Sequence, residues 1–146
     1  MSVATERSAP LADLLCFDLY AASRAVTARY RALLAELDLT YPQYLVLLLL
    51  GDAEQLSVRR IAADLHLDHS TLTPLLRRLE RSGLLTRSRN ADDERVVDIA
   101  LTARGRQVVE RFGEVQDGMR EAMGLSPREA HSLQEALRRL ATSVEG

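Results

Sequence analysis

The chain has 146 residues, 47% of them hydrophobic and 27% charged, with a formal net charge of −2 at pH 7. This length and composition predict a soluble protein with a packed core, either one compact domain or a small domain with dimerising extensions. The longest apolar run, residues 44–50, is far shorter than the roughly 20 residues of a membrane span, and residues 1–10 hold no apolar signal region. We therefore expect a cytoplasmic protein that does not associate with a membrane.

The basic residues and the single cysteine limit the kinds of binding site and reactive group that the chain can form. All 19 basic residues are arginine, which reflects either a GC-rich genome or the use of arginine's planar fork on phosphate and guanine. The single cysteine, Cys16, excludes an intrachain disulfide and a cysteine-based metal cluster. It is therefore either a buried, inert thiol or a reactive one. We expect neither a metal site nor a cofactor.

The chain begins with two predicted helices. The first runs from Pro10 to about Leu37, a segment without glycine or further proline whose apolar residues recur at helical spacing. The second begins after Thr40, which is placed to cap it, and has Pro42 in its first turn. Gly51 is expected to end this second helix.

A helix-turn-helix pattern follows. Its first helix is short and carries apolar residues at helical spacing, and residues 66–68 form the turn. Its second helix ends at Ser82 and Gly83. Pro74 cannot donate a hydrogen bond inside a helix, so we expect this second helix to begin near Ser70 or Thr71.

Beyond Gly83 the pattern changes to strands. Residues 84–89 and 96–101 are two short strand-like runs joined by a polar turn over residues 90–94, which predicts a β-hairpin wing. Thr102 then caps a helix from Ala103 to about Met123, and Ser126 and Pro127 open a last helix.

The predicted fold class is mainly α with a small β-hairpin wing. A winged helix-turn-helix DNA-binding domain covers residues 40–102, and a helical dimerisation region covers residues 1–39 and 103–146. The terminal helices have apolar faces outside the winged module. A second chain would cover these faces in a homodimer, and an αα-hairpin packed onto a monomer is the alternative.

The charge distribution favours double-stranded DNA as the partner. Residues 57–89 hold seven arginines and three acidic residues, a local net charge of +4 in a chain of −2. The polar side chains of such a helix can meet base edges and phosphates in the major groove, although a merely solvated face is the alternative. A two-fold dimer would read a pseudo-palindromic operator with half-sites about 10 base pairs apart. The residues expected at the DNA are His69, Ser70, Thr71, Thr73, Arg77, Arg78, Arg87 and Arg89.

One further arginine, Arg95, closes the turn of the wing after three consecutive acidic residues. An arginine at a hairpin tip suits the negative potential of a narrow minor groove. Acidic neighbours would repel phosphate unless one of them orients the arginine, and we assign that role to Asp93. An ordinary polar turn is the alternative.

Cys16 lies on the first predicted helix, with Tyr20 one turn later and Tyr30 fourteen residues later. Fourteen residues come within about 40° of whole turns, so Cys16 and Tyr30 share a face but lie about 21 Å apart along one straight helix. An antiparallel pair of these helices, crossing near Ser23, would bring Tyr30 of one chain beside Cys16 of the other. A phenol hydroxyl that donates to the sulfur would favour an oxidisable thiolate. Tyrosines that only fill a helix face are the alternative.

Four stretches resemble a known family. They are LCFDLYAASRAVTARY, LTYPQYLVLLLL, LHLDHSTLTPLLRRLERSGLLTR and DDERVVDIALTARG. They resemble the MarR family, and specifically its organic hydroperoxide resistance regulators, from Leu14 to about Arg106.

This resemblance implies a repressor that senses organic hydroperoxides. It implies that Cys16 is the reactive thiol, that Tyr30 and Tyr41 reach it from the other subunit, and that Tyr20 is a third tyrosine of the pocket. The family's wing motif falls on Asp93 and Arg95. The second cysteine that some members use is absent, which implies a sulfenic acid followed by a mixed disulfide with a small thiol.

One departure from the family and two alternative functions remain. His69 and Ser70 replace the usual Ser-Gly, which changes what meets DNA at the start of the recognition helix. The first alternative is a regulator of the same type that responds to a small aromatic or phenolic ligand, with Cys16 structural. The second is a one-cysteine thiol peroxidase, but the chain lacks a Thr-x-x-Cys peroxidase setting, so we do not expect an enzyme.

Overall fold

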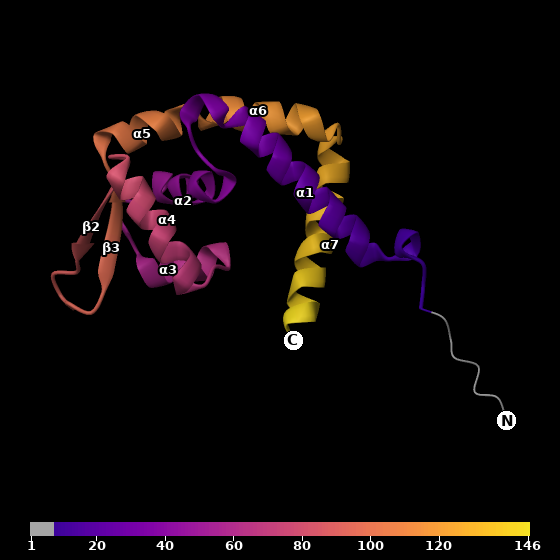
Figure 1. Ribbon diagram of the computed structural model, residues 1–146, viewed down its shortest axis with the longest axis horizontal. Coiled ribbons are helices and arrows are strands. Elements are labelled where there is room, and N and C mark those ends of the chain that lie inside the picture. Colours follow the sequence, from indigo (N-terminus) through magenta and orange to yellow (C-terminus); the bar gives the residue numbers. More distant parts are fainter. Residues whose placement is uncertain (1–7) are drawn as a thin grey trace.

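The computed structural model describes residues 8–146, and Figure 1 shows their arrangement. Part of the expectation about the start of the chain falls on residues 1–7, which lie outside the described residues. Helices α5 and α6 run along one side. The strands and α2, α3 and α4 form a lobe at one end, and α1 and α7 lie at the other. The elements are η1 (Leu11–Asp13), α1 (Leu15–Leu33), η2 (Ala35–Leu37), α2 (Tyr41–Gly51), β1 (Leu56–Ser57), α3 (Val58–Leu65), α4 (His69–Arg81), β2 (Leu85–Arg89), β3 (Val97–Leu101), α5 (Ala103–Glu110), α6 (Phe112–Met123) and α7 (Pro127–Glu145).

The predicted fold class, mainly helical with a small β-hairpin wing, is confirmed. Strands β2 and β3 pair in antiparallel register from Leu85 opposite Leu101 to Arg89 opposite Val97. The sequence analysis missed β1, whose two residues pair with β3 through Leu56 opposite Ile99. The sheet order is therefore β1-β3-β2. Two residues are too few to show the alternation that marks a strand.

The predicted single helix over residues 10–37 is wrong, because the segment divides into η1, α1 and η2. Leu14 is extended, with φ −91° and ψ 116°, and separates η1 from α1. After Leu33 the chain forms the 3-10 helix η2, and Asp38 then takes a left-handed conformation with φ 55°. This turn buries Leu34 and Leu39 in the core. Tertiary burial therefore overrides a sequence that is locally compatible with one helix.

The predicted helix over residues 103–123 is also divided, at Arg111, into α5 and α6. Phe112 opens α6 and is 2% exposed. Its ring centroid lies 4.7 Å from that of Tyr44 on α2. The packing of Phe112 against α2 accounts for the break, and Gly113, a weak helix former, follows it directly.

Helix α4 begins at His69, one or two residues earlier than expected, with Pro74 inside it. A proline at this position cannot donate to the carbonyl of Ser70, four residues back. Both residues are exposed, so water can satisfy that carbonyl. The proline is tolerated because it lies on the outer face.

The predicted helix starts are present as side-chain caps. Thr40 and Gln43 form a reciprocal capping box at α2, and Ser126 and Glu129 form another at α7. Thr102 caps α5 by accepting from the N–H of Gly105 at 3.0 Å. Each cap satisfies backbone donors that the first helical turn leaves free.

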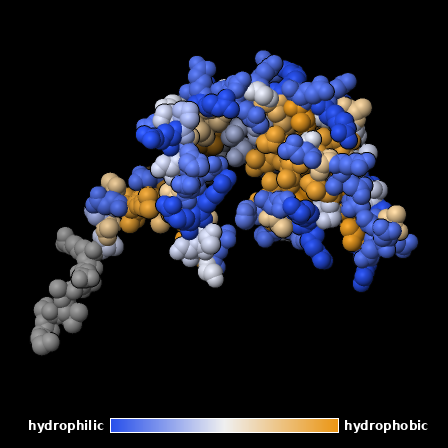
Figure 2. Space-filling view, turned by 180° about the vertical axis from the view of Figure 1, so that it is seen from behind, coloured by the Kyte–Doolittle hydropathy of each residue, from blue (hydrophilic) through white to orange (hydrophobic). Residues whose placement is uncertain are grey.

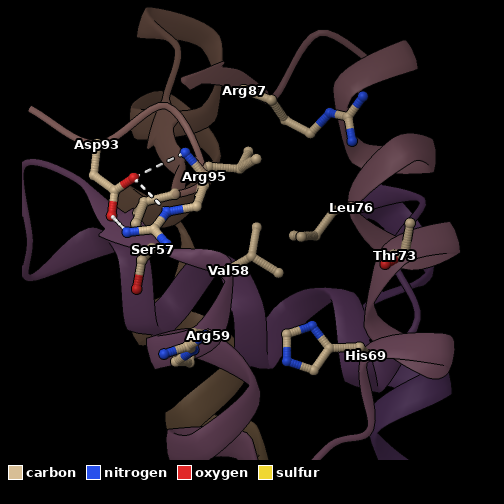
Figure 3. A pocket seen from close by; sticks show the side chains of 11 residues that line it. Ser57, Val58, Arg59, His69, Thr73, Leu76, Arg87, Asp93 and Arg95 are labelled. Atoms are coloured by element: carbon tan, nitrogen blue, oxygen red, sulfur yellow. Dashed lines mark hydrogen bonds and ion pairs between the residues drawn. The ribbon is translucent and has the colours of Figure 1, made fainter. Parts of the chain in front are cut away.

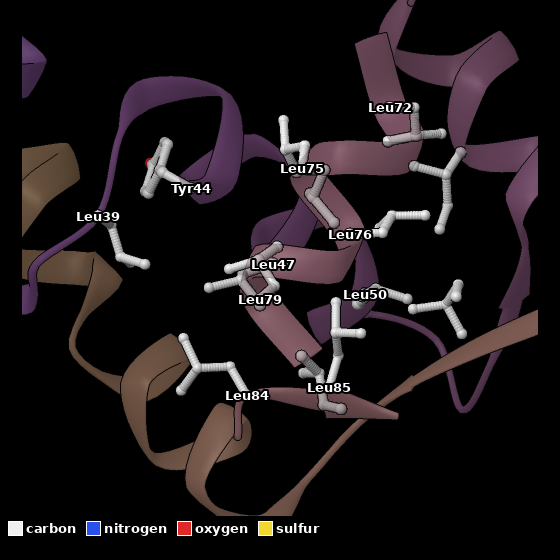
Figure 4. Close-up of a cluster of buried hydrophobic side chains, with 14 of the residues drawn as sticks. Leu39, Tyr44, Leu47, Leu50, Leu72, Leu75, Leu76, Leu79, Leu84 and Leu85 are labelled. Atoms are coloured by element: carbon white, nitrogen blue, oxygen red, sulfur yellow. The ribbon is translucent and has the colours of Figure 1, made fainter. Parts of the chain in front are cut away.

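The core lies in the lobe that carries the helix-turn-helix and the strands (Figure 4). Leucines on one face of α4 pack against α2 and the start of β2. Gly105 lets α5 approach the sheet, because a Cβ there would overlap the carbonyl oxygen of Leu84. The hydroxyl of Thr102 donates to the carbonyl of Gly83 at 2.7 Å, so the end of the wing is fixed to the end of α4. The core residues are Leu34, Leu39, Tyr44, Val46, Leu47, Leu50, Ile61, Ala62, Leu72, Leu75, Leu76, Leu79, Leu84, Leu85, Ile99, Leu101, Phe112 and Val115.

The terminal helices are different, because neither α1 nor α7 has a buried residue. Figure 2 shows apolar surface beside the described start of the chain. Large exposed apolar side chains there and on α7 include Leu11 at 59%, Leu15 at 63% and Leu133 at 49%. No helix within residues 8–146 is long and apolar enough to cross a membrane.

Candidate DNA-binding surface and redox site

Helix α4 presents two different faces. Leu72, Leu75, Leu76 and Leu79 are buried in the core, which fixes the rotation of the helix. The opposite side is exposed, except that Thr73 is half-buried. This outer side carries most of the residues expected at DNA, namely His69, Ser70, Thr71, Thr73, Arg77 and Arg78.

A groove of about 540 Å³ lies between α4, the start of α3 and the wing (Figure 3). His69 and Thr73 line it from α4, and Arg59 lines it from α3. Asp93 and Arg95 lie on the wing side of this groove. The structure therefore brings together residues from the recognition helix and from the wing. Arg59 was counted in the basic segment but was not predicted as a contact, because its place beside the wing is not visible in the sequence.

The two arginines of β2 differ in their surroundings. Arg87 lies in the groove, and its Nε is 3.3 Å from a carboxylate oxygen of Glu80 on α4. This ion pair holds Arg87 across the junction of helix and sheet. Arg89 is exposed at the end of β2, where the turn of the wing begins.

At the wing, the carboxylate of Asp93 contacts Arg95. Its Oδ1 accepts from the backbone N–H of Arg95 at 3.1 Å and from Nε at 3.2 Å. Hydrogen bonds from the Arg95 side chain and backbone lower the pKa of Asp93. The side chain of Arg95 is nevertheless 91% exposed. The arginine is thus held at its base and presented to solvent. Both residues lie in the turn between β2 and β3.

Cys16 is the second residue of α1, and it is exposed. Tyr20 is 57% exposed, and its hydroxyl accepts from Nη1 of Arg24 at 3.1 Å. The sulfur and the Tyr20 ring thus occupy an open surface of this chain.

Tyr30 and Tyr41 form the second half of the predicted redox site. Their rings stack at 4.2 Å with an interplanar angle of 8°, and both pack beside the buried Tyr44. Burial, followed by the neighbouring Tyr44 and Tyr41, raises the pKa of Tyr30 to about 12. Burial also raises the pKa of Tyr41. Both phenols therefore keep their protons at neutral pH and can act as donors.

The sequence analysis missed the role of Tyr44 in this cluster. Its signal was the spacing in Tyr41-Pro-Gln-Tyr44, since residues three apart share a helix face. The structure does not bring Cys16 and Tyr30 together within one chain, because fourteen residues of α1 separate them, about 21 Å of helix.

The fold and this surface define a class, the winged-helix DNA-binding transcriptional regulators. Residues 29–112 match the family described as transcriptional regulator SarA/Rot. The organic hydroperoxide resistance transcriptional regulator of Bacillus subtilis is 43% identical over 135 residues, which are 92% of this chain and 90% of that protein.

Solved structures agree with this class. Reduced AbfR bound to DNA is 34% identical, with a TM-score of 0.76 over 93% of this chain and 95% of AbfR. PcaV of Streptomyces coelicolor, in complex with its natural ligand, is 27% identical, with a TM-score of 0.86 over 94% of this chain and 99% of PcaV. The chain belongs to the MarR family of transcriptional regulators, in the group of the organic hydroperoxide resistance regulators. These relatives are DNA-binding regulators and not enzymes.

Proposed function

We propose that the protein is a homodimeric repressor that releases its operator DNA when an organic hydroperoxide oxidises Cys16. The observation that carries this proposal is the division of the redox residues along α1. An exposed thiol lies at one end, and a half-buried, stacked pair of phenols, Tyr30 of α1 and Tyr41 of α2, lies at the other. An antiparallel pair of α1 helices would join the two halves into one site. Bare apolar faces on α1 and α7 support such a dimer.

The proposed chemistry uses the thiolate as the nucleophile. The sulfur of Cys16 attacks one peroxide oxygen, and the O–O bond breaks. The sulfur keeps the attacked OH group and becomes a sulfenic acid, while the alkoxide leaves with the bonding electron pair and takes a proton to become an alcohol. A small thiol then condenses with the sulfenic acid, which gives a mixed disulfide and water. The proposed phenol donors would favour the thiolate that starts this sequence.

We assign DNA contact to α4 and the wing, with residues 40–102 as the DNA-binding domain and residues 1–39 and 103–146 as the dimerisation region. Thr73 and Arg77 would meet base edges, and Arg95 would reach the flanking minor groove. The operator would be a pseudo-palindrome with half-site centres about 10 base pairs apart. We assign this activity to the cytoplasm, because the proposed small-thiol partner and the DNA target would both be found there.

A DNA-shift assay with and without an organic hydroperoxide tests the proposal directly. The wild type should release DNA on oxidation. Cys16→Ser should bind with near-native affinity and stay bound, because residue 16 is on α1 and not on the DNA surface. Release of the Cys16→Ser variant by peroxide would overturn the sensor assignment.

The second candidate is a regulator of the same family that responds to a small aromatic or phenolic ligand, with Cys16 structural. The likeness to ligand-bound PcaV favours it. In that case phenolic compounds, and not hydroperoxide, would release the wild type, and Cys16→Ser would respond as the wild type does.

A further inference from the structure

Asp98 on β3 is the one buried charged side chain among residues 8–146, with 7% of its surface exposed. Its Oδ2 accepts a hydrogen bond from the side-chain amide of Asn90 at 2.7 Å and from that of Gln55 at 3.4 Å. Both donors are neutral. Burial of a carboxylate is costly unless its oxygens are hydrogen-bonded, so the acid and its two amides form a fixed unit.

Asn90 connects this unit to the turn of the wing. While its amide nitrogen donates to Asp98, its Oδ1 accepts from the backbone N–H groups of Asp92 at 2.8 Å and Asp93 at 3.1 Å. The backbone N–H of Asn90 also donates to the carbonyl of Val96 at 2.8 Å. One side chain therefore joins the buried acid of the sheet to the backbone of the exposed turn.

The last link reaches Arg95. Asp93, whose N–H is held by Asn90, accepts from Nε of Arg95 at 3.2 Å and from Nη2 at 3.4 Å (Figure 3). The order of contacts is Asp98, Asn90, Asp93, Arg95. Asp98 and Asn90 carry no positive charge. Their link to Arg95 runs through Asp93.

We propose that Asn90 and Asp98 are positioning residues for the DNA contact of Arg95. They fix the conformation of the turn before DNA is bound, so that less conformational entropy is lost when the arginine enters the groove. This inference rests on the proposed contact between Arg95 and DNA. It adds two residues that touch neither base nor phosphate and that nevertheless determine affinity.

Asn90→Asp is the main test. The new side chain keeps an oxygen for the N–H groups of Asp92 and Asp93, but it loses the amide donor and sets a second carboxylate against Asp98. Operator affinity, measured by fluorescence anisotropy at one fixed salt concentration, should fall about tenfold. Ala91→Asp is the matched control, because residue 91 is exposed in the same turn and the added charge is the same. It should weaken binding less than about twofold.

The hydrogen bond can also be reversed. In the double variant Asn90→Asp with Asp98→Asn, the amide introduced at position 98 can donate to the carboxylate introduced at position 90. Affinity should return to within about twofold of the wild type. A failure of the double variant to recover would overturn the inference, as would equal losses in Asn90→Asp and Ala91→Asp.

The effect of Asn90→Asp on DNA affinity should depend on Arg95 if Asn90 positions that arginine, but not if Asn90 only stabilises the fold. On an Arg95→Ala background, Asn90→Asp should weaken binding by less than about twofold, because its effect passes through the missing arginine. A full additional loss would overturn the positioning role and leave the proposed function intact. If Arg95→Ala alone binds as the wild type does, the proposed wing contact itself is wrong. If Asn90→Asp does not fold, Asn90→Ser takes its place, since a serine caps the turn but is too short to reach Asp98, and the same expectations apply.

Discussion

Removal of the Tyr30 hydroxyl is the sharpest perturbation of the proposed redox site. In Tyr30→Phe the ring remains, so its stacking on Tyr41 at 4.2 Å and its contact with Tyr44 are preserved. The lost group is one protonated donor, since the pKa of Tyr30 is raised to about 12. A hydrogen bond to a charged group contributes about 1.5–3 kcal/mol, or roughly ten- to hundredfold in an equilibrium. Because Tyr41 remains as a second donor, we expect oxidation of Cys16 to slow by about tenfold.

Mixed dimers show whether this contact crosses the subunits. One chain carries Cys16→Ser and the other Tyr30→Phe, each with its own affinity tag, and the heterodimer is isolated by two purification steps. In a cross-subunit site, the remaining cysteine faces the native Tyr30 of the other chain. Its oxidation, followed by intact mass after limiting organic hydroperoxide, should then proceed at the wild-type rate.

The Tyr30→Phe homodimer is the slow reference for this experiment. If the mixed dimer is as slow as that homodimer, the contact lies within one chain and the cross-subunit sensor is refuted. If the homodimer itself reacts at the wild-type rate, the Tyr30 hydroxyl has no role in the reaction.

The remaining predictions concern the wing, the phenols and the packing of α5. Arg95→Ala should weaken operator binding most at A·T-rich flanks and reduce the salt slope by about one, whereas Thr73→Ala should change preference among core base pairs; identical footprints and slopes would contradict this division. The raised pKa of Tyr30 favours its protonated form in the folded state, so stability should fall as the pH rises from about 10 to about 12, and chemical denaturation should show a smaller fall for Tyr30→Phe. Gly105→Ala should lower stability by about 1–3 kcal/mol in the same assay, because the new methyl group meets the carbonyl of Leu84, and an unchanged midpoint would contradict that contact.

Local signals in the sequence were sufficient for the helix-turn-helix and the hairpin of the winged module, but not for β1. The starts of α2 and α7 were visible because Thr40 and Ser126 can each cap a helix and are each followed by a proline in the first helical turn. The hairpin was visible because polar turn residues separate two strand-like runs. These features depend on neighbours within a few positions.

The breaks at Leu34 and Arg111 depend on contacts distant in sequence, which local patterns do not show. Leu34 is fully buried, and Phe112 after Arg111 packs on Tyr44. Both are ordinary helix-compatible apolar residues. The buried Asp98 was hidden for a related reason, since a polar residue in a strand normally indicates the solvent side. The cross-subunit redox site remains a prediction, because it needs a second chain.

The absence of buried residues from α7 has a consequence for how the protein is made. Most of the stability of a helix in a protein comes from packing of its apolar face, and α7 buries no residue against its own chain. In the proposed dimer, α7 becomes fully stable only after a second polypeptide arrives, so completion of the fold is a bimolecular event governed by mass action. The number of copies in the cell then sets the share of chains able to repress. If the protein represses its own gene, a low protein concentration would leave few dimers, relieve repression and so raise expression of the gene.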